Sequence, residues 1–501
     1  MNSLLMVDGY KVGHHLMYPD KIEKVYSNFT PRSNKYAPQG NNGMILNFGQ
    51  QAIVRYIVDH FNENFFKNPK NEVINEIKKE MSMYLNLDYD TTHFEKLHDL
   101  GYLPLKIKSL EEGTESPIKV PILTLVNTHP EFAWLTNYLE TIISNLLWQP
   151  ITSATTALIY RRMATNWVNK TDKNNLILID WMLHDFSMRG LTGLDAAIFS
   201  GMAHASVFLG SDSLPVIYGA RKFYDEEGFV VGSVNASEHS IMSSGGVEGE
   251  LEIYRRLIHK FPSGILSLVS DTYDLWRVIT EYLPQLKDEI LAREGKLVIR
   301  PDSGNPVDII CGVPMVSTSG DGVNWDDTYK DGYKKGSVQQ KGVIELLWDI
   351  FGGTINDQGY KVLDPHIGMI YGESINTENY QQILARLERK GFAATNLFCG
   401  IGSYTYQMKT RDTWGIACKC TAQQVDGKLV AIFKDPITDS GLKKSAKGLL
   451  CVRKDFSGYY LNDNCTWEQE NEGELKTIFE DGVFKNQTTL TKIRENIKKL
   501  L

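Results

Sequence analysis

Five short segments of the sequence combine charged side chains with glycines or hydroxyls, and each follows an apolar run that we expect to be a β-strand. They read His184-Asp185-Phe186-Ser187-Met188-Arg189-Gly190, Ser270-Asp271-Thr272-Tyr273-Asp274, Arg300-Pro301-Asp302-Ser303-Gly304, Tyr371-Gly372-Glu373-Ser374 and Cys399-Gly400-Ile401-Gly402-Ser403. Arginine guanidinium groups and the backbone N–H groups that glycines leave accessible both suit tetrahedral phosphate. The carboxylates of Asp271, Asp302 and Glu373 suit ribose hydroxyls or a magnesium ion. The pattern therefore favours a phosphate-binding site.

A simpler explanation of these segments is that strand ends collect glycine, aspartate and serine because these residues form turns. Their recurrence at five successive strand ends favours the binding site instead. The known sequence signatures of P-loops, of H-E-x-x-H zinc sites and of G-x-S-x-G hydrolases are missing. The stretch Asn235–Ser240 places His239 beside an acid among small residues, so its imidazole is either a nucleophile or base, or a structural histidine.

The composition is that of an ordinary globular protein with room for more than one domain. The chain has 501 residues, of which 42% are hydrophobic and 23% are charged. Its 53 Lys and Arg against 61 Asp and Glu give a net charge of −8, which repels a polyanion, so we expect no nucleic-acid partner. We also expect no membrane partner and no signal peptide, because the apolar stretches are short and residues 1–11 lack a basic region. The six cysteines lack the spacing of a disulfide framework, which predicts reduced thiols and a cytoplasmic location.

The segments that carry the candidate chemistry lie in a region, residues 151–408, where short apolar runs alternate with helical patterns. The predicted strands and following helices are 176–182 with 194–208, 265–269 with 273–291, 297–299 with the segment from 306, and 367–370 with 378–389. This alternation indicates parallel strands with crossover helices, in an α/β barrel or a doubly wound sheet. Ligands bind at the carboxyl ends of the strands in both architectures, so the segments should meet at one edge. A Gly-, Asp- and Lys-rich stretch over 317–337 is interpreted as an inserted surface loop.

The two ends of the chain have a different character. Residues 1–150 are mixed and end in a helix, which apolar residues at helical spacing predict over 132–146. Residues 409–501 favour β-structure, with a hairpin predicted from the runs 416–421 and 429–433 around a turn at 425–427. We therefore expect a barrel domain over 151–408 and a mixed α+β domain to which residues 1–150 and 409–501 both contribute.

Further motifs join these segments into a series that runs in order over nearly the whole chain. They are Asp8-Gly9-Tyr10-Lys11 with His14 and Tyr18-Pro19, His184-Asp185-Phe186 with Arg189-Gly190, Gly210-Ser211-Asp212, Glu238-His239-Ser240, Ser270-Asp271, Ile299-Arg300-Pro301-Asp302-Ser303-Gly304-Asn305-Pro306, Thr410-Arg411-Asp412 and Phe433-Lys434-Asp435-Pro436. In this order the motifs resemble the nicotinate/nicotinamide phosphoribosyltransferase family of the type II phosphoribosyltransferases. The stretch 317–337 and the last residues contribute least to the resemblance.

The resemblance implies transfer of the phosphoribosyl group of phosphoribosyl pyrophosphate to nicotinamide, which gives nicotinamide mononucleotide and pyrophosphate in NAD salvage. It implies an irregular α/β barrel plus a mixed α+β domain formed by the N- and C-terminal segments. It also implies a homodimer with shared active sites, Mg²⁺, and ATP as the phosphoryl donor to His239, a step that favours the transfer.

The resemblance also implies roles for individual residues of this sequence. The catalytic residues would be His239, Asp271 and Asp302, with Asp271 orienting the imidazole and Asp302 holding ribose hydroxyls. The groups that bind pyrophosphate would be Arg189, His239 and Arg300, with added charge from the partner subunit's Arg32, Arg411, Lys419 and Lys443. The groups around the nucleotide phosphate would be Gly372, Glu373, Gly402 and Ser403.

The pyridine ring of the substrate would lie between two aromatic side chains, Phe186 and the partner subunit's Tyr10. Asp212 bears on the choice of base, because a carboxylate accepts the N–H of a carboxamide but repels a carboxylate substrate. It therefore favours nicotinamide over nicotinate.

Three residues at two sites depart from the family pattern, and three other functions remain as alternatives. Glu373 stands where an aspartate is usual, and Ser403 and Tyr404 replace glycines of a Gly-rich turn, which would narrow the phosphate site if a glycine backbone is needed. The alternatives are a nicotinate phosphoribosyltransferase, a non-catalytic signalling member of the family, and a barrel glycosidase that uses Asp271 and Asp302 as its acid pair.

Overall fold

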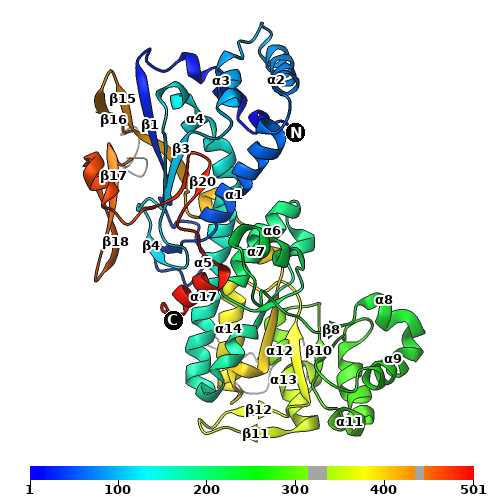
Figure 1. Ribbon diagram of the computed structural model, residues 1–501. Helices are drawn as coiled ribbons and strands as arrows, with labels where there is room; N and C mark the ends of the chain where they lie inside the picture. The colour runs from blue at the N-terminus through cyan, green and yellow to red at the C-terminus, as the bar shows by residue number, and fades with distance from the viewer. Residues whose placement is uncertain (314–335, 435–444) are drawn as a thin grey trace, which may run out of the picture.

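The computed structural model describes residues 1–313, 336–434 and 445–501. The prediction of an inserted loop over 317–337 lies almost wholly outside these ranges, and Lys443 lies outside them too. The described chain forms two large sheets with helices around them, one antiparallel and one parallel (Figure 1).

The antiparallel sheet is built from both ends of the chain. Its strands, in spatial order, are β16 (Lys428–Ala431), β15 (Ala417–Val425), β1 (Ile22–Thr30), β5 (Leu123–Asn127), β3 (Leu105–Ser109), β19 (Lys476–Glu480) and β20 (Val483–Phe484). The longest pairing joins β1 to β15, so residues about 400 positions apart in sequence lie side by side. The sheet therefore combines the N- and C-terminal segments as the sequence predicts.

The predicted hairpin is present as β15 and β16, which pair antiparallel across Asp426 and Gly427. Both turn residues have positive φ, 50° and 71°, which is the backbone that a two-residue hairpin turn requires.

The parallel sheet forms the barrel. Its strands, in spatial order, are β7 (Gly210–Ser211), β6 (Leu183–Asp185), β14 (Leu397–Ile401), β13 (Ile367–Tyr371), β10 (Leu297–Arg300), β9 (Leu266–Val269) and β8 (Asn235–Ala236). All six neighbouring pairs are parallel. A further parallel bridge between Gly210 and Gly232 links β7 to the segment that enters β8, so the sheet curls round on itself. The predicted irregular α/β barrel is confirmed.

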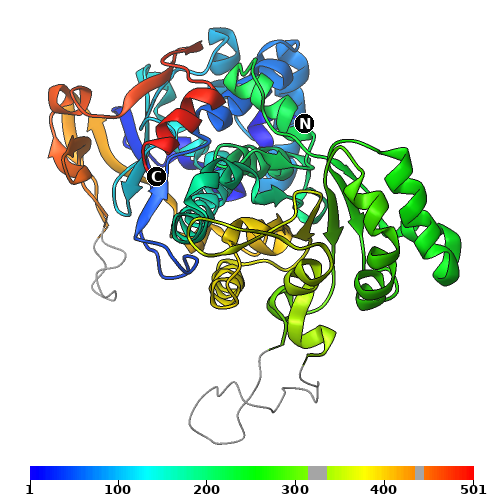
Figure 2. The same cartoon turned by 90° about the horizontal axis from the view of Figure 1, so that it is seen from below.

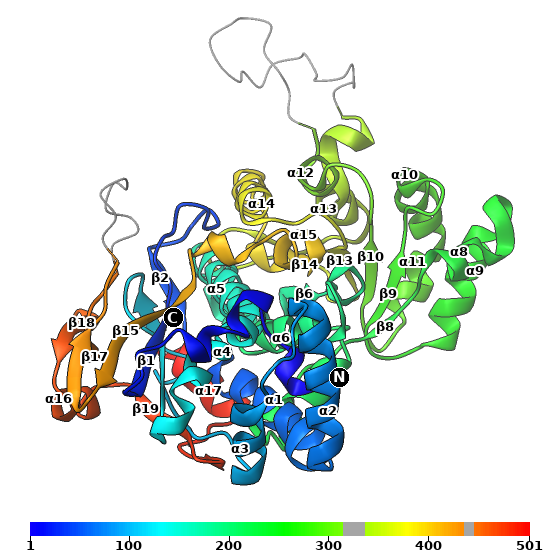
Figure 3. The same ribbon diagram turned by 90° about the horizontal axis from the view of Figure 1, so that it is seen from above.

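Helices cover both sheets (Figures 2 and 3). Those before the barrel are α1 (Gln50–Phe61), α2 (Lys70–Leu85), α3 (Thr92–Leu100), α4 (Ala133–Tyr138) and α5 (Glu140–Thr171). Those within the barrel region are α6 (Leu194–Ala205), α7 (Pro215–Tyr224), α8 (His239–Met242), α9 (Gly246–Lys260), α10 (Leu275–Arg277), α11 (Leu283–Leu291), α12 (Pro306–Cys311), α13 (Val338–Phe351), α14 (Thr377–Arg389) and α15 (Ser403–Tyr406). Those after it are α16 (Trp467–Asn471) and α17 (Leu490–Lys498).

Three two-stranded sheets complete the fold. They are β2 (Met44–Leu46) with β4 (Glu115–Pro117), β11 (Gly353–Ile355) with β12 (Lys361–Leu363), and β17 (Leu449–Asp455) with β18 (Gly458–Cys465). None of the helices in the described ranges combines the length and the apolar character that crossing a bilayer requires.

Helix α5 joins the two halves of the molecule, because it contributes to both large hydrophobic cores. Ile151 and Leu158 pack in the core beneath the antiparallel sheet, whereas Ala164 and Val168, further along the helix, pack against the barrel. The helix runs without interruption through Pro150, so it crosses the boundary that we placed after residue 150. The division into 1–150, 151–408 and 409–501 stays a prediction.

One predicted strand is wrong. Residues 176–182 were expected to be extended, but they lie in a 3-10 helix (Lys173–Trp181), and the strand β6 begins only at Leu183. Leu176 and Ile177 are exposed, so this apolar run does not enter the core. A short apolar run cannot be assigned to strand or helix by its periodicity alone. The strand begins immediately after it, so its carboxyl end still leads into Phe186.

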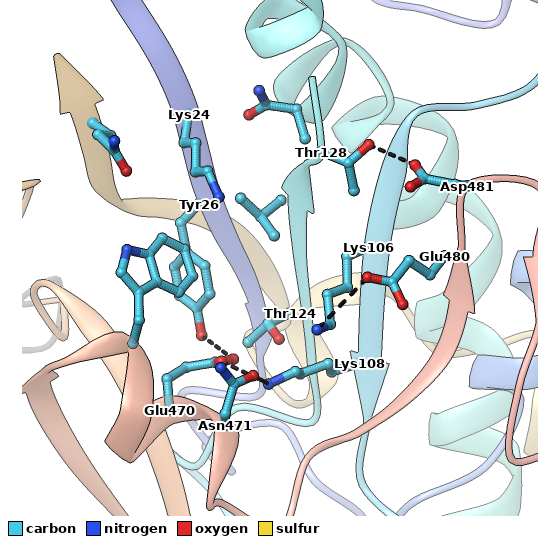
Figure 4. Close-up of a pocket in the computed structure, with 14 residues that line it drawn as sticks. Lys24, Tyr26, Lys106, Lys108, Thr124, Thr128, Glu470, Asn471, Glu480 and Asp481 are labelled. Carbon is cyan, nitrogen blue, oxygen red and sulfur yellow. Dashed lines mark hydrogen bonds and ion pairs between the residues drawn. The ribbon is translucent and has the colours of Figure 1, made fainter. Parts of the chain in front are cut away.

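A buried ion pair fixes the C-terminal segment to the N-terminal one. Lys108 on β3 donates to Glu470 Oε2 of α16 at 2.6 Å and to Asn471 Oδ1 at 2.9 Å (Figure 4). Both charged side chains are almost fully buried. Breaking such a pair is costly because the remaining charge stays buried without a partner.

We therefore expect Glu470→Ala to lower the free energy of unfolding by about 3–5 kcal/mol. The matched control is Glu468→Ala, which removes an exposed carboxylate two residues earlier and should change stability by no more than about 0.5 kcal/mol. Urea denaturation followed by circular dichroism measures both. Equal stability of the two variants would contradict a tethering role for the Lys108–Glu470 pair.

Candidate active site

The candidate residues of the barrel follow its parallel strands, and their positions at one edge of the sheet are now fixed by the strand order. Phe186 follows β6, Asp271 follows β9, and Gly372 follows β13. Arg300 ends β10, and Gly402 follows β14. Because all these strands run parallel, the structure brings these residues to the same edge of the barrel, as predicted.

Asp302 and Gly372 approach each other closely at the ends of two neighbouring strands. A Cβ atom on residue 372 would lie 2.4 Å from Asp302 Oδ1. The Gly372 N–H donates to the carbonyl of Pro301 at 3.2 Å, which holds the two strand ends together. Glycine at 372 is therefore what allows the Asp302 carboxylate to lie against the end of β13.

Three carboxylates meet around Asp302. Burial raises the pKa of Asp302, the positive charge of Arg300 lowers it, and the negative charges of Asp271 and Glu373 raise it further. Asp271 Oδ2 accepts from the Asp302 N–H at 2.9 Å and from Ser303 Oγ at 2.5 Å. Asp271 Oδ1 is buried and has no hydrogen-bond partner in the described structure. Hydroxyl donors or a cation would relieve this concentration of negative charge.

The predicted magnesium ion fits these carboxylates only in part. Within the described ranges, no group of three or more His, Cys, Asp or Glu side chains has the arrangement of a metal site. Mg²⁺ commonly binds to one or two protein carboxylates and completes its shell with water and substrate phosphates. The unpartnered oxygen of Asp271 suits that arrangement. A magnesium ion here would therefore depend on oxygens that the substrate supplies.

Arg300, at the end of β10, is held by the backbone of the residue that follows β8. Its Nη2 donates to the carbonyl of Ser237 at 2.5 Å, while its buried Nε lacks a hydrogen-bond partner in the described structure. Ser237 is itself fixed, because its hydroxyl accepts from the Val269 N–H at 3.0 Å. The guanidinium is thus positioned, and its Nη1, which is neither buried nor hydrogen-bonded in the described structure, is the donor available to an anion. Arg189 lies in the exposed turn Met188–Gly190 after β6.

His239 is exposed at the start of α8, and its side chain lies close to the residue after Asp271. His239 Nδ1 is 3.1 Å from Thr272 Oγ1. The hydrogen bonds that the structure gives to Asp271 go to residues 302 and 303 instead of the imidazole. The hydroxyl of Thr272, which the sequence analysis did not single out, is therefore the group that orients the ring in this structure.

Phe186 packs closely against the backbone of the adjacent strand, β14. A Cβ atom on residue 400 would lie 2.1 Å from its ring, so only a glycine at this position of β14 allows the contact. The Phe186 N–H donates to the carbonyl of Ile401 at 3.0 Å. The backbone at Gly400 thus supports one side of the half-buried ring, and the accessible part of the ring can contact an aromatic ligand.

Asp212 lies beside Phe186 at the end of the next strand. Its N–H donates to the carbonyl of Asp185 at 3.0 Å, and Ser233 Oγ donates to its Oδ1. The carboxylate is exposed, so the hydroxyl of Ser233 fixes its direction without covering it. Burial lowers the pKa of His184, which lies on β6 between these groups, to about 4, so this imidazole is neutral near pH 7.

Ser403 occupies the position of an expected glycine without backbone strain. Neither Ser403 nor Tyr404 has positive φ, so neither residue needs a glycine conformation. The space comes from the facing strand end, because a Cβ atom on Gly190 would lie 2.4 Å from Ser403 Oγ. A side chain at Gly402 would meet nothing within 4 Å. The predicted narrowing at this turn is therefore offset by the glycine beside Arg189.

The remaining predicted residues lie outside the barrel edge. Tyr10 is 66% exposed and packs edge-on to His14 with a ring distance of 5.3 Å. Arg32 Nε donates to the carbonyl of Gly415 at 2.8 Å, and burial together with the positive charge of Arg411 lowers its pKa. Lys419 is exposed on β15. The contacts described for Tyr10, Arg32 and Lys419 go to the N- and C-terminal segments, so the structure of one chain does not bring this set to the barrel residues.

Sequence reasoning missed several short polar side chains at the site. They are Ser233, Ser237, Thr272 and Ser303, which hold Asp212, Arg300, His239 and Asp271 respectively. Three of them lie within two residues of a predicted site residue, and only their position in the sequence could have pointed to them.

The chain is similar to phosphoribosyltransferases over most or all of its length. Residues 181–489 match the model of the nicotinate phosphoribosyltransferase (NAPRTase) family. A nicotinamide phosphoribosyltransferase of Acinetobacter baylyi is 45% identical, and the match covers 100% of this chain and 98% of that protein. A nicotinamide phosphoribosyltransferase of Mycoplasma pneumoniae is 33% identical over 88% of this chain and 93% of its own length.

Solved structures support the fold. The nicotinate-nucleotide pyrophosphorylase of Pyrococcus furiosus superposes with a TM-score of 0.56 at 14% identity, covering 99% of this chain and 95% of that one. Human nicotinic acid phosphoribosyltransferase superposes with a TM-score of 0.55 at 17% identity, covering 98% and 93%. The match to the family model and the full-length relatives agree with the resemblance that the motifs carry, so the chain belongs to the nicotinate phosphoribosyltransferase (NAPRTase) family.

Proposed function

We propose that this protein is a pentosyltransferase that transfers the phosphoribosyl group of phosphoribosyl pyrophosphate to nicotinamide. The products are nicotinamide mononucleotide and pyrophosphate, as in NAD salvage. The observation that carries the proposal is the convergence of Phe186, Asp212, Arg300 and Asp302 at one edge of the barrel. The 45% identity with a nicotinamide phosphoribosyltransferase over the full chain supports it.

Departure of pyrophosphate leaves positive charge on the ribose and negative charge on the leaving group, so catalysis depends on positioning and on electrostatic stabilisation. Arg189, His239 and Arg300 would bind the pyrophosphate. Arg300 is suited to this role because a backbone carbonyl fixes its Nη2 while its Nη1 stays available to an anion. Asp271, whose Oδ1 has no hydrogen-bond partner in the described structure, would help to hold a Mg²⁺ ion, which would supply positive charge to the phosphates.

Asp302 would hold the ribose through hydrogen bonds from its hydroxyls. As a carboxylate it accepts such bonds, and its place against Gly372 fixes it beside the neighbouring strand. Glu373, Gly402 and Ser403 would border the phosphate of the nucleotide. The longer side chain of Glu373 is exposed, so the extra methylene group can extend toward solvent.

The base would stack on Phe186 with its carboxamide N–H directed to Asp212. A second chain would supply the other aromatic face, the partner subunit's Tyr10, together with the positive charges of the partner subunit's Arg32, Arg411, Lys419 and Lys443. A homodimer is supported by the apolar side chains near Tyr10, since Leu16 and Met17 are 78% and 75% exposed. The six free cysteines fit the cytoplasmic location that we propose.

ATP would act as a phosphoryl donor to His239. The imidazole nitrogen forms a bond to the γ-phosphorus, ADP leaves, and the phosphohistidine is hydrolysed after the transfer to favour nucleotide formation. The exposure of His239 and its orientation by Thr272 make the ring accessible to a bound nucleotide.

The proposal predicts that the wild-type protein forms nicotinamide mononucleotide, with kcat/KM higher for nicotinamide than for nicotinate. In Asp212→Asn this ratio should fall about 10–100-fold, because a hydrogen bond to a charged group contributes about 1.5–3 kcal/mol. The control is Asp195→Asn, an exposed carboxylate on α6 that bonds to Tyr56, which should keep the wild-type ratio. A tenfold preference of the wild type for nicotinate would favour the alternative nicotinate phosphoribosyltransferase.

The second prediction concerns the acid side of the pH profile. Asp302 must be ionised to accept hydroxyl donors, so kcat/KM for phosphoribosyl pyrophosphate should fall as the pH decreases through the pKa of Asp302. The negative charge of Glu373 raises this pKa. In Glu373→Gln the fall should move to lower pH, by up to about one unit. The control is Glu378→Gln, which removes an exposed carboxylate on α14 and should leave the pH profile unchanged. If the fall in Glu373→Gln moved to higher pH, Glu373 would not raise the pKa of Asp302.

The third prediction tests the phosphorylated histidine and separates the remaining alternatives. Incubation with γ-labelled ATP should label the wild type and His259→Ala, whose histidine is exposed on α9, but not His239→Ala. The label should be unstable to acid, as expected for a phosphohistidine. An unlabelled wild type that still makes nicotinamide mononucleotide would remove the phosphorylation step, whereas neither label nor product would favour the non-catalytic or glycosidase alternative.

A further inference from the structure

A cavity lies on the antiparallel sheet, outside the barrel. It encloses about 540 Å³, within the range of about 300–1,000 Å³ that is usual for small-molecule sites. Its floor is formed by side chains on one face of β1, β5 and β3, and α16 forms a wall (Figure 4). Lys24, Tyr26 and Asn28 share one face of β1, because alternate residues of a strand share a face. Of these three, Lys24 and Tyr26 line the cavity, whereas Asn28, which is paired with Lys419, does not. The cavity is therefore at one end of β1, away from the barrel edge.

Three lysine side chains from two strands enter the cavity, and they differ in how well they are paired. Lys108 is neutralised by Glu470 at 2.6 Å. Lys106 Nζ is 3.7 Å from Glu480 Oε1, and that carboxylate is closer to Lys485, at 2.5 Å. Among the described residues, no carboxylate pairs with Lys24. The ammonium group of Lys24 is thus available to bind an anion, and that of Lys106 is only weakly held by its longer contact to Glu480.

An aromatic surface lies beside the unpaired ammonium group. Lys24 Nζ is 4.9 Å from the centroid of the Trp467 ring, so this face of the indole is accessible from the cavity. Tyr26 packs edge-on behind the ring at 5.9 Å and holds it in place. A planar group can replace the ammonium on this face, because tryptophan stacks well on other aromatic rings. The displaced Lys24 would remain close enough to bind an anion attached to that group.

The opposite side of the cavity offers an acceptor for hydroxyl groups. Thr128 Oγ1 donates to Asp481 Oδ1 at 2.5 Å, and Oδ2 has no hydrogen-bond partner among the described residues. A carboxylate with one free oxygen is the kind of group that binds ribose hydroxyls in nucleotide sites. The cavity thus combines an aromatic face, two available cations and one hydroxyl acceptor.

We propose that this cavity binds a nucleoside monophosphate, with the base on Trp467, the phosphate between Lys24 and Lys106, and a ribose hydroxyl at Asp481. A simple anion would leave the indole face and the acceptor unused. A neutral aromatic compound would leave the ammonium group of Lys24 without an anionic partner and that of Lys106 with only its 3.7 Å contact to Glu480. A ligand with all three parts matches each available group of the lining.

The test is calorimetric titration of the full-length protein with adenosine monophosphate. We expect saturable binding to the wild type, weakened at least tenfold in Trp467→Ala and in the double variant Lys24→Gln with Lys106→Gln. The matched controls are Phe456→Ala, which removes a fully exposed ring, and Lys21→Gln, which removes an exposed ammonium just before β1. These variants should bind within about twofold of the wild type. The double lysine variant keeps Trp467 and its edge-on contact with Tyr26, so it tests the site even if Trp467→Ala unfolds.

Three results would overturn the proposal. The first is a wild type that does not bind adenosine monophosphate. The second is binding that survives in Trp467→Ala but is lost in Arg300→Ala, since this would assign the nucleotide to the barrel edge. The third is inorganic phosphate binding as tightly as adenosine monophosphate. Formation of nicotinamide mononucleotide is measured separately and should be within about twofold of the wild type in the Lys24 and Lys106 double variant, so the two proposals can fail independently.

Discussion

The close approach of neighbouring strand ends in the barrel is the constraint on which the candidate site depends. Parallel strands bring their carboxyl ends to one edge, but they bring backbone there as well, and functional side chains need room beside it. In three places a glycine supplies that room: Gly372 beside Asp302, Gly400 beneath Phe186 and Gly190 beside Ser403. A Cβ atom at any of these positions would lie 2.1–2.4 Å from the facing side chain. Each glycine thus leaves room for the facing side chain, and its backbone lies close enough to restrict the position of that side chain.

The residues at the strand ends could be predicted because the functional residues of each end lie in one short, continuous segment of sequence. Arg300, Asp302 and Gly372 lie where expected, since a parallel sheet leaves little freedom in where a strand end points. The hydrogen-bond partners could not be predicted in the same way. Thr272 lies beside His239 although 33 positions separate them, and Asp271, the expected partner, turns to the segment after β10. Such pairings depend on how the ends of β8, β9 and β10 are staggered, which a single sequence does not encode locally.

The limits of local pattern are also visible in the elements themselves. The apolar run 176–182 looked like a strand, but a 3-10 helix forms there with Leu176 and Ile177 exposed. The sequence predicts a mixed α+β domain from both chain ends but not its antiparallel sheet, because the main pairing, β1 with β15, joins residues about 400 positions apart. The continuity of α5 through Pro150 was missed, because its first turns pack in one core and its later turns in the other.

Negative charge is in excess both over the whole chain and at the centre of the barrel edge. The chain as a whole carries a net charge of −8, and the centre of the barrel edge concentrates the carboxylates of Asp271, Asp302 and Glu373. Alone, that cluster would repel a pyrophosphate. Arg300 offsets part of it, as the lowering of the Asp302 pKa by its charge indicates. Arg189 lies at the same edge, in the turn after β6, whereas Arg32 and Lys419 lie on the terminal segments. The homodimer that we propose would add the positive charges of those segments to the site. The carboxylates around Asp302 thus give a physical reason why the proposed function includes cations from a second subunit.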